Sequence, residues 1–295
     1  VIVSNDLWDR IRAGFAMPEL DSPLVARHEQ YYLSRPDYLQ RMFGRGSFYL
    51  HHIVEEVERR GMPTELALLP FVESAMNPSA LSSAKAAGLW QFIPATGKRY
   101  DLNQNWWVDN RRDVVQSTRA ALDYLQTIYQ MNGDDWFLAL ASYNWGEGAV
   151  RKAVRANHAA GKPADYAHLR MPNETRNYVP KLLALKHIVL NARQLGLQLP
   201  DLPDHVSQAA YFVVSEALAN LNKHSGATAA GVDARVVDGA LIVRISDNGI
   251  GGASTAKGHG LAGLVERLNG VDGRLTITSP TGGPTTLEAR IPCAF

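Results

Sequence analysis

One carboxylic acid in this sequence stands in surroundings that suit acid–base catalysis. Glu73 ends an apolar helical run that reads Leu-Pro-Phe-Val-Glu-Ser from residue 69 to 74. A carboxyl group that loses hydration in apolar surroundings has a raised pKa and stays protonated near neutral pH. A general acid for glycosidic cleavage needs that property. Taken alone, the pattern fits a helix-end glutamate facing water even better, so Glu73 is at this point only a candidate.

Three ordered groups of residues around and after Glu73 carry a specific resemblance. Residues 73–82 and 86–97 contain Glu-Ser and Gly-Leu-Trp-Gln-Phe-Ile-Pro, residues 141–148 contain Ser-Tyr-Asn-Trp-Gly, and residues 174–179 read Glu-Thr-Arg-Asn-Tyr-Val. Together they resemble the motifs of the soluble lytic transglycosylase fold family, and the membrane-bound D type of that family most closely. The resemblance covers about residues 5–200 and implies an all-α, lysozyme-like domain that cleaves peptidoglycan.

The resemblance also implies a reaction with one carboxylate. Ordinary glycosidases use two, about 5 to 9.5 Å apart, and these motifs hold no partner that must be a nucleophile. Glu73 would protonate the oxygen between N-acetylmuramic acid and N-acetylglucosamine, while the substrate's N-acetyl group stabilises the resulting cation. Glu73 would then take the proton of the muramic acid 6-hydroxyl, which closes a 1,6-anhydro ring. No metal or other cofactor is expected.

By the same resemblance, six residues would bind the glycan strand. Ser82 and Gln91 would hydrogen-bond the sugar, Tyr143 and Tyr178 would line the groove, and Glu174 would be a supporting carboxylate. The full implied set is Ser82, Gln91, Tyr143, Asn144, Glu174 and Tyr178.

Other motif residues have structural alternatives. Trp90 and Phe92 are expected in the core, and Ser74 either braces a helix end or contacts substrate. The motif glycines are expected to permit close backbone approach: Gly88, Gly146 and Gly148.

The elements that must position these residues are predicted from apolar spacing. Helices are expected over residues 48–60, 65–73, 112–130, 136–143, 146–158 and 178–195, the first of them stopped by Gly61. A Pro-marked junction near residue 200 then separates domains 1–200 and 203–295. The second domain should be a smaller α/β two-layer sandwich, with a helix over 206–224 and hairpins over 231–246 and 274–291.

Four segments of the second domain resemble the ATP-binding domain of sensor histidine kinases that act with LuxR-type response regulators. They span residues 214–224, 247–251, 258–264 and 283–285. By this resemblance Asn220, on one helix face with Glu216, would hold a Mg²⁺ ion bound to ATP, and Asp247 would accept from the adenine amino group. The implied nucleotide-binding set is Glu216, Asn220, Asp247, Gly249, Gly251, Gly258, Gly260 and Thr285.

No dimerising helical hairpin with a phosphoacceptor histidine precedes residue 203, so kinase activity is not expected. His51 and His52 lie among residues that match the transglycosylase. An alternative function is therefore an ATP-binding regulatory module on a helical scaffold. A third is a peptidoglycan-binding protein without activity, against which the presence of Glu73 argues.

The composition argues against several classes of protein. The 295 residues are 46% hydrophobic and 20% charged, with a net charge of +1. This is too little basic excess for a nucleic-acid partner. The single cysteine, Cys293, allows no internal disulfide. No apolar run approaches the ~18 residues of a membrane span, and no basic and apolar leader opens the sequence.

The two resemblances imply different compartments. A lytic transglycosylase works in the periplasm or cell envelope, whereas the kinase-type domain is normally cytoplasmic. The junction at 197–204 is too short to cross a membrane. We therefore expect a chimera of two fragments, with a natural cytosolic fusion as the alternative.

Overall fold

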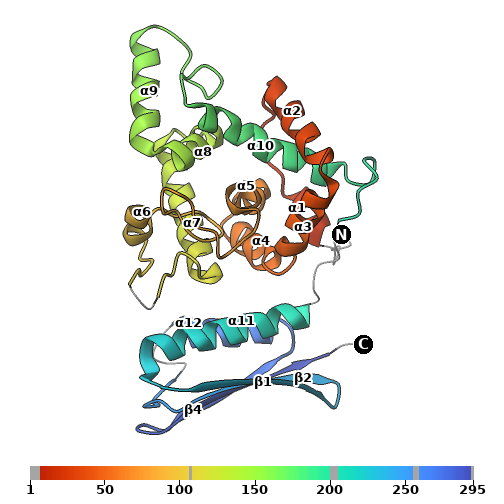
Figure 1. Ribbon diagram of the computed structural model, residues 1–295, viewed down its shortest axis with the longest axis vertical. Coiled ribbons are helices and arrows are strands. Elements are labelled where there is room, and N and C mark those ends of the chain that lie inside the picture. Colours follow the sequence, from red (N-terminus) through yellow and green to blue (C-terminus); the bar gives the residue numbers. More distant parts are fainter. Residues whose placement is uncertain (1–6, 106–107, 200–204, 255–258, 294–295) are drawn as a thin grey trace. The chain divides into compact units, whose positions relative to one another are not determined.

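The computed structural model describes residues 7–105, 108–199, 205–254 and 259–293. It divides into two compact units, Val1–Leu202 and Pro203–Phe295, which are drawn in Figure 1. Each unit has its own hydrophobic core. Among the described helices, none combines the length and the apolar character needed to span a membrane.

The N-terminal unit is built from helices around a short central one. Its elements are α1 (Leu7–Ala13), α2 (Pro23–Leu33), α3 (Pro36–Gly46), α4 (Leu50–Arg59), the 3₁₀ helix η1 (Thr64–Leu68), α5 (Leu69–Ser74), α6 (Pro94–Arg99), α7 (Val114–Met131), α8 (Trp136–Trp145), α9 (Glu147–Ala159) and α10 (Asn173–Leu190). Figure 1 shows α5 at the centre of this unit, ringed by the other helices. The all-helical expectation for this part of the chain is confirmed.

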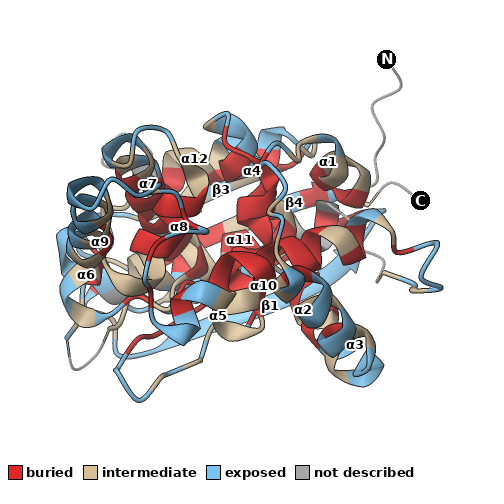
Figure 2. Ribbon diagram, turned by 90° about the horizontal axis from the view of Figure 1, so that it is seen from above, coloured by how far each residue is buried: buried red, intermediate tan, exposed pale blue. Residues whose placement is uncertain are grey.

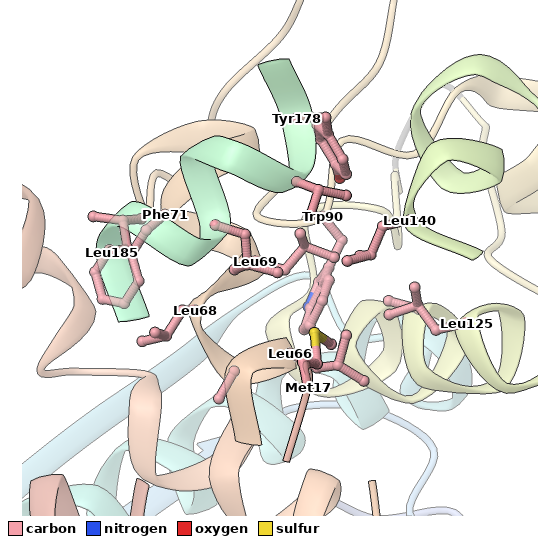
Figure 3. Packing of buried hydrophobic residues seen from close by; sticks show 14 of the residues in the cluster. Met17, Leu66, Leu68, Leu69, Phe71, Trp90, Leu125, Leu140, Tyr178 and Leu185 are labelled. Carbon is pink, nitrogen blue, oxygen red and sulfur yellow. The ribbon is translucent and has the colours of Figure 1, made fainter. Parts of the chain in front are cut away.

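The central helix is buried because its apolar residues face other elements on several sides. Phe71 of α5 packs edge-on against Phe43 of α3, with ring centroids 5.2 Å apart. Figure 3 shows Leu68 of η1 and Leu185 of α10 in the same cluster as Phe71 and Trp90. Buried positions also run along α8 and α10 in Figure 2. Glu73, in the last turn of α5, therefore stands on a packed hydrophobic base.

Several predicted boundaries differ from the structure. The run over 65–73 is a 3₁₀ turn followed by α5, because Pro70 at the start of α5 lacks the N–H that a continuous helix would use. The last helix begins at Asn173, five residues earlier than predicted, and contains Pro180. α1, α2, α3 and α6 were not predicted, although Pro23, Pro36 and Pro94 occupy the favoured first helical positions.

The C-terminal unit is a four-stranded antiparallel sheet with two helices packed on it. Its elements are α11 (His205–Asn220), a π-helical turn (Leu221–Ser225), β1 (Ala230–Val237), β2 (Ala240–Asp247), α12 (His259–Asn269), β3 (Arg274–Thr278) and β4 (Thr285–Pro292). The strand order is β1-β2-β4-β3. Val213 of α11 and Leu264 of α12 share one core with Val243 of β2 and Ala289 of β4.

Both predicted hairpins form. Asp238 and Gly239 have φ of 47° and 67°, which suits the tight turn between β1 and β2. β3 pairs antiparallel with β4. The predicted helix over 206–224 ends as an α-helix at Asn220 and continues as the π-helical turn, followed by Gly226 with φ of 60°. The α/β two-layer expectation therefore describes this unit.

Candidate functional site

Glu73 lies in the last turn of α5, where it meets α10. The residue retains partial solvent exposure, but its carboxyl is surrounded by protein. The Tyr178 hydroxyl donates a hydrogen bond to Glu73 Oε1. Burial raises the pKa of Glu73 to about 7, and the negative charge of Glu174 adds to the rise, while the Tyr178 hydrogen bond and the charge of Lys181 oppose it. Glu73 can therefore give up and take back a proton near neutral pH.

The chain turns sharply after Glu73 and is tied down there by Ser74. Ala75 and Met76 have φ of 50° and 58°, which ends α5. The Ser74 hydroxyl lies 2.9 Å from the Leu89 carbonyl oxygen and 3.1 Å from that of Pro70. Ser74 therefore braces the helix end against the following loop, which is the structural one of its two predicted roles.

An arginine outside the motifs holds the loop that contains residues 86–97. Arg111 is buried and donates to the carbonyls of Lys85 and Phe92 at 2.7 and 3.0 Å. Its guanidinium also pairs with both oxygens of Asp109, at 2.8 and 2.7 Å. A Cβ on Gly88, whose φ is 84°, would lie 1.8 Å from the Arg111 carbonyl oxygen. Gly88 thus permits close approach, as predicted.

The other two motif glycines differ from expectation. Gly146 has a φ of 97° at the junction of α8 and α9, but a Cβ there would meet nothing within 4 Å. Backbone conformation, and not close approach, requires glycine at that position. Gly148 has neither a positive φ nor a close neighbour, so the prediction for it was wrong.

Ser82 and Gln91 shape the same loop. Ser82 Oγ accepts a hydrogen bond from the Ala86 N–H at 3.0 Å, and Gln91 Nε2 donates to the Gly88 carbonyl at 2.9 Å. Gln91 has a φ of 49°, unusual for a residue with a side chain. Both side chains stay partly exposed, and neither hydrogen-bonds to Glu73 in the described structure. Among the described residues, none accepts a hydrogen bond from the Ser82 hydroxyl and none donates one to the Gln91 side-chain oxygen.

Tyr143 stands on the α8 side of Glu73. Its hydroxyl donates to the Trp90 carbonyl at 2.8 Å. Burial, and next the negative charge of Glu73, hold the pKa of Tyr143 well above its usual value. The Tyr143 ring lies 5.4 Å from that of Tyr124 and 6.4 Å from that of Phe92. Trp90 itself is fully buried, with its indole N–H on Thr118 Oγ1 at 3.0 Å, and Phe92 is buried, so both are core aromatics as predicted.

Asn144 and Glu174 connect the motif at residues 141–148 to the motif at residues 174–179. The Thr175 hydroxyl donates to Asn144 Oδ1 at 2.8 Å, and Asn144 Nδ2 lies 3.4 Å from Glu174 Oε1. Glu174 is exposed at the start of α10. The structure therefore gathers Tyr143, Tyr178 and, through its charge, Glu174 around Glu73, whereas Ser82 and Gln91 belong to the adjoining loop.

A second set of candidate residues lies in the C-terminal unit. Asn220 Nδ2 donates to Glu216 Oε1 at 3.1 Å on α11. The start of α12 packs against this pair, since a Cβ on Gly260 would lie 2.0 Å from Glu216 Oε1 and 3.4 Å from Asn220 Nδ2. Gly258 of the implied nucleotide-binding set lies outside the described residues. The structure thus brings together Glu216, Asn220 and Gly260, which come from two of the predicted segments.

Asp247 and the nearby glycines form the other half of this set. Asp247 Oδ1 accepts from the Gly249 N–H at 2.7 Å. A Cβ on Gly249 would lie 2.3 Å from the Ser225 carbonyl oxygen, and one on Gly251 would lie 1.9 Å from that of Pro280. Packing within the unit therefore requires glycine at both positions.

Thr285, from the last predicted segment, lies beside Asp247. It pairs with Asp247 across β2 and β4, so the two side chains share one face of the sheet. Its hydroxyl lies 2.8 Å from Ser279 Oγ.

Known proteins resemble this chain in two ways. A model of the "Transglycosylase SLT domain" family matches residues 52–165. The chain is 46% identical over 200 residues to "Membrane-bound lytic murein transglycosylase D" of Escherichia coli, covering 66% of this chain and 43% of that protein. It thus spans less than half the length of that relative. It is also 37% identical over 154 residues, 48% of this chain and 39% of the other, to "Signal transduction histidine-protein kinase/phosphatase DegS" of Brevibacillus brevis.

A solved structure of lytic transglycosylase Slt from Pseudomonas aeruginosa matches with a TM-score of 0.37 and 21% identity, over 52% of this chain and 25% of that one. The family match spans α4 through α9 and contains Glu73, Gln91 and Tyr143. Residues 52–165, within the N-terminal unit, therefore match the Transglycosylase SLT domain family.

Proposed function

We propose that the N-terminal unit cleaves the bond between N-acetylmuramic acid and N-acetylglucosamine in peptidoglycan and forms a 1,6-anhydro product. The observation that carries this proposal is Glu73, an enclosed carboxyl whose pKa is raised to about 7 and which a tyrosine hydroxyl contacts. A general acid works best when its pKa lies near the operating pH. The similarity to a lytic murein transglycosylase supports peptidoglycan as the substrate.

In the proposed reaction Glu73 acts twice. It first gives its proton to the glycosidic oxygen as the bond to the muramic acid C1 breaks, and the substrate's N-acetyl oxygen stabilises the positive charge. The Glu73 carboxylate then takes the proton of the 6-hydroxyl while that oxygen bonds to C1. Such substrate-assisted routes are an exception to the two-carboxylate rule. Proton gain and loss cancel, so the enzyme returns to its starting state without consuming water.

Tyr178 and Tyr143 would support this cycle. The Tyr178 hydroxyl stays protonated, because burial holds its pKa well above the usual value. It can therefore donate to Glu73 when Glu73 becomes a carboxylate. Glu174 is exposed and lies near Asn144, which suits a supporting charge better than a nucleophile. Ser82 and Gln91 would offer their free hydroxyl proton and side-chain oxygen to the sugar.

Digestion of purified peptidoglycan sacculi tests this proposal. We expect anhydro-muropeptides, detected by mass spectrometry, from the whole chain and at least about 10²-fold less from Glu73→Gln, whose circular dichroism spectrum should be unchanged. The matched control is Glu174→Gln, which removes the other nearby carboxylate and should still form the anhydro product. Products with a reducing end instead of the anhydro ring would show hydrolysis and contradict the proposal.

We further propose that the C-terminal unit binds ATP with Mg²⁺. The similarity to a histidine kinase and the packing of Gly260 on Glu216 and Asn220 support this. The Asn220 side-chain oxygen would hold Mg²⁺, which prefers oxygen ligands, and Asp247 Oδ2 would accept from adenine. Bound Mg²⁺ would neutralise the phosphate charge.

Calorimetry with Mg-ATP on the whole chain tests this second proposal. Asp247→Asn should weaken binding, whereas Asp238→Asn, a matched change in the β1–β2 turn where asparagine tolerates positive φ, should not. Equal affinity for both variants would contradict it. Because peptidoglycan lies in the cell envelope and this domain type is normally cytoplasmic, we propose that the two units act independently. Mg-ATP should then leave the rate of sacculus digestion unchanged.

A further inference from the structure

β1 forms one edge of the C-terminal sheet and is exposed along its whole length. Within the described residues it pairs only with β2, and each of its eight residues is exposed. Its sequence, Ala-Gly-Val-Asp-Ala-Arg-Val-Val, contains no proline or lysine. Proteins commonly protect an open edge with such residues, with bulges or with a covering element. β1 has neither of these two residue types and continues without a bulge in its register with β2, and its charged residues are one of each sign, Asp233 and Arg235.

The backbone groups on the open edge come from alternate residues. The Ala229 carbonyl accepts a hydrogen bond from the Asn248 N–H at 3.3 Å, so residue 229 faces β2. In an antiparallel pair, successive residues point their backbone groups to opposite sides. The odd-numbered residues of β1 therefore bond toward β2. Ala230, Val232, Ala234 and Val236 direct their N–H and C=O groups to the open edge.

The two faces of β1 differ in chemistry. Val232 and Ala234 pair across from Ile245 and Val243, which are buried core residues, so they lie on the core face of the sheet. Val232 and Val236 nevertheless stay 49% and 61% exposed. Asp233 and Arg235 lie on the other face, with their charged groups 4.0 Å apart and both side chains more than half exposed.

The order Val-Asp-Ala-Arg-Val is complementary to itself when reversed. We propose that β1 pairs antiparallel with β1 of a second copy of this chain, about a two-fold axis at Ala234. In that register Asp233 lies opposite Arg235 of the partner and Val232 lies opposite Val236, each twice. The even-numbered backbone groups then bond across the axis, joining two four-stranded sheets into one.

The proposed register pairs backbone hydrogen-bonding groups, opposite charges and apolar side chains at the same time. Asp233 and Arg235 fall on a non-hydrogen-bonded position, where opposing side chains come closest. Opposite charges and β-branched pairs across strands are each stabilising. A two-fold interface uses the same patch on both copies, which a self-complementary strand provides. Opposite charges in a symmetric order favour a second copy over an unrelated peptide.

The association state of the whole chain tests this proposal. Light scattering and sedimentation should show a concentration-dependent species near twice the 32.4 kDa of one chain. Asp233→Arg places like charges opposite each other and should shift the protein to monomer. The swapped double variant Asp233→Arg with Arg235→Asp restores opposite charges and should restore the dimer. A chain that is monomeric at every concentration, or a dimer that Asp233→Arg leaves intact, would overturn the proposal.

A disulfide trap tests the register itself. In a Cys293→Ser background, Ala234→Cys places a thiol opposite its own copy, at the ~5.5 Å Cα separation of a hydrogen-bonded pair, which a disulfide can bridge. Mild oxidation should give a covalent dimer on a non-reducing gel. The matched control Val232→Cys should not cross-link, because its copy lies four residues along the strand, about 13 Å away. Equal cross-linking of both variants would contradict a two-fold axis at Ala234.

Discussion

Two glutamates eight residues apart, Glu65 and Glu73, are both enclosed in the helical core, yet they meet different partners. Glu65 is fully buried. It accepts from the backbone N–H groups of Ala16 and Met17 at 3.0 and 2.9 Å and lies 3.3 Å from Lys186 Nζ. Two backbone donors and one positively charged side chain therefore hold Glu65.

Glu73 meets a neutral hydroxyl and a neighbouring negative charge. Tyr178 donates to it, and Glu174 lies near enough to raise its pKa. Burial alone therefore does not distinguish the two glutamates. Their partners differ, because two backbone N–H groups and an ammonium group surround Glu65, whereas a neutral hydroxyl and a nearby negative charge surround Glu73. Glu65 is placed to hold the N-terminal segment on α10, and Glu73 is placed to exchange a proton.

The largest expected effect is on activity at Glu73. Glu73→Gln cannot donate or accept the proton, so formation of anhydro-muropeptides from sacculi should fall by about 10² to 10⁴-fold. The midpoint of thermal unfolding should stay the same or rise, because a neutral amide replaces an acid in an enclosed site. A variant that loses its fold together with its activity would show that Glu73 has a structural role, as Glu65 does.

The next effect is on stability at Glu65. Glu65→Gln leaves Lys186 without one buried charge partner, and the unfolding free energy should fall by about 3 to 5 kcal/mol in chemical denaturation. The product per folded molecule should be unchanged. As a matched control, Glu58→Gln removes a partly exposed ion pair with Arg10 and should cost less than about 1 kcal/mol. Equal costs for the two variants would contradict the role assigned to Glu65.

The comparison also predicts how stability depends on pH. The folded pKa of Glu73, about 7, lies above its ordinary value of 4.5. Its protonated form therefore favours folding below pH 4.5, and this contribution is lost as pH rises through 7. Between pH 4.5 and 7, the unfolding free energy of the wild type should fall by up to about 3 kcal/mol relative to that of Glu73→Gln. A constant difference between the two proteins from pH 4 to 8 would contradict the raised pKa.

The smallest expected effect belongs to Tyr178. Its hydrogen bond lowers the pKa of Glu73, so Tyr178→Phe should move the alkaline limb of the pH–rate profile upward by about one unit. The rate below that limb should fall less than in Glu73→Gln. Tyr166→Phe is a matched control, because that buried hydroxyl bonds the Thr175 carbonyl and not Glu73. It should leave the limb in place.

Much of the helical fold could be predicted from local pattern, but its tertiary pairings could not. Apolar spacing and Gly61 located α4, and the Asp238-Gly239 turn located the β1–β2 hairpin. The pairing of Glu65 with Lys186 joins residues 121 positions apart, and each looks locally like an ordinary charged residue. The helices that begin at Pro23 and Pro36 were missed because their apolar stripes are short, although proline at the first position marked them.

The candidate site shows the same limit. Glu73 and Tyr178 each stood in a motif, but their contact depends on how α10 crosses α5. Arg111, which clamps the loop of Gly88, lies outside the quoted motifs and has no local signal beyond Asp109 two residues earlier. The sequence predicted β1 as the first strand of a hairpin. Only the strand order shows that this strand lies at an edge.

A direct titration of the Glu73 carboxyl tests the central claim that this residue stays protonated near neutral pH. Glutamate side chains labelled with ¹³C at the carboxyl carbon would be followed by NMR from pH 3 to 9, and Glu73→Gln would assign the signal. We expect one carboxyl that titrates near pH 7 in the wild type and is missing from the variant. If the signal assigned to Glu73 titrates at or below its ordinary value of 4.5, the residue is a carboxylate at neutral pH, and the claim fails.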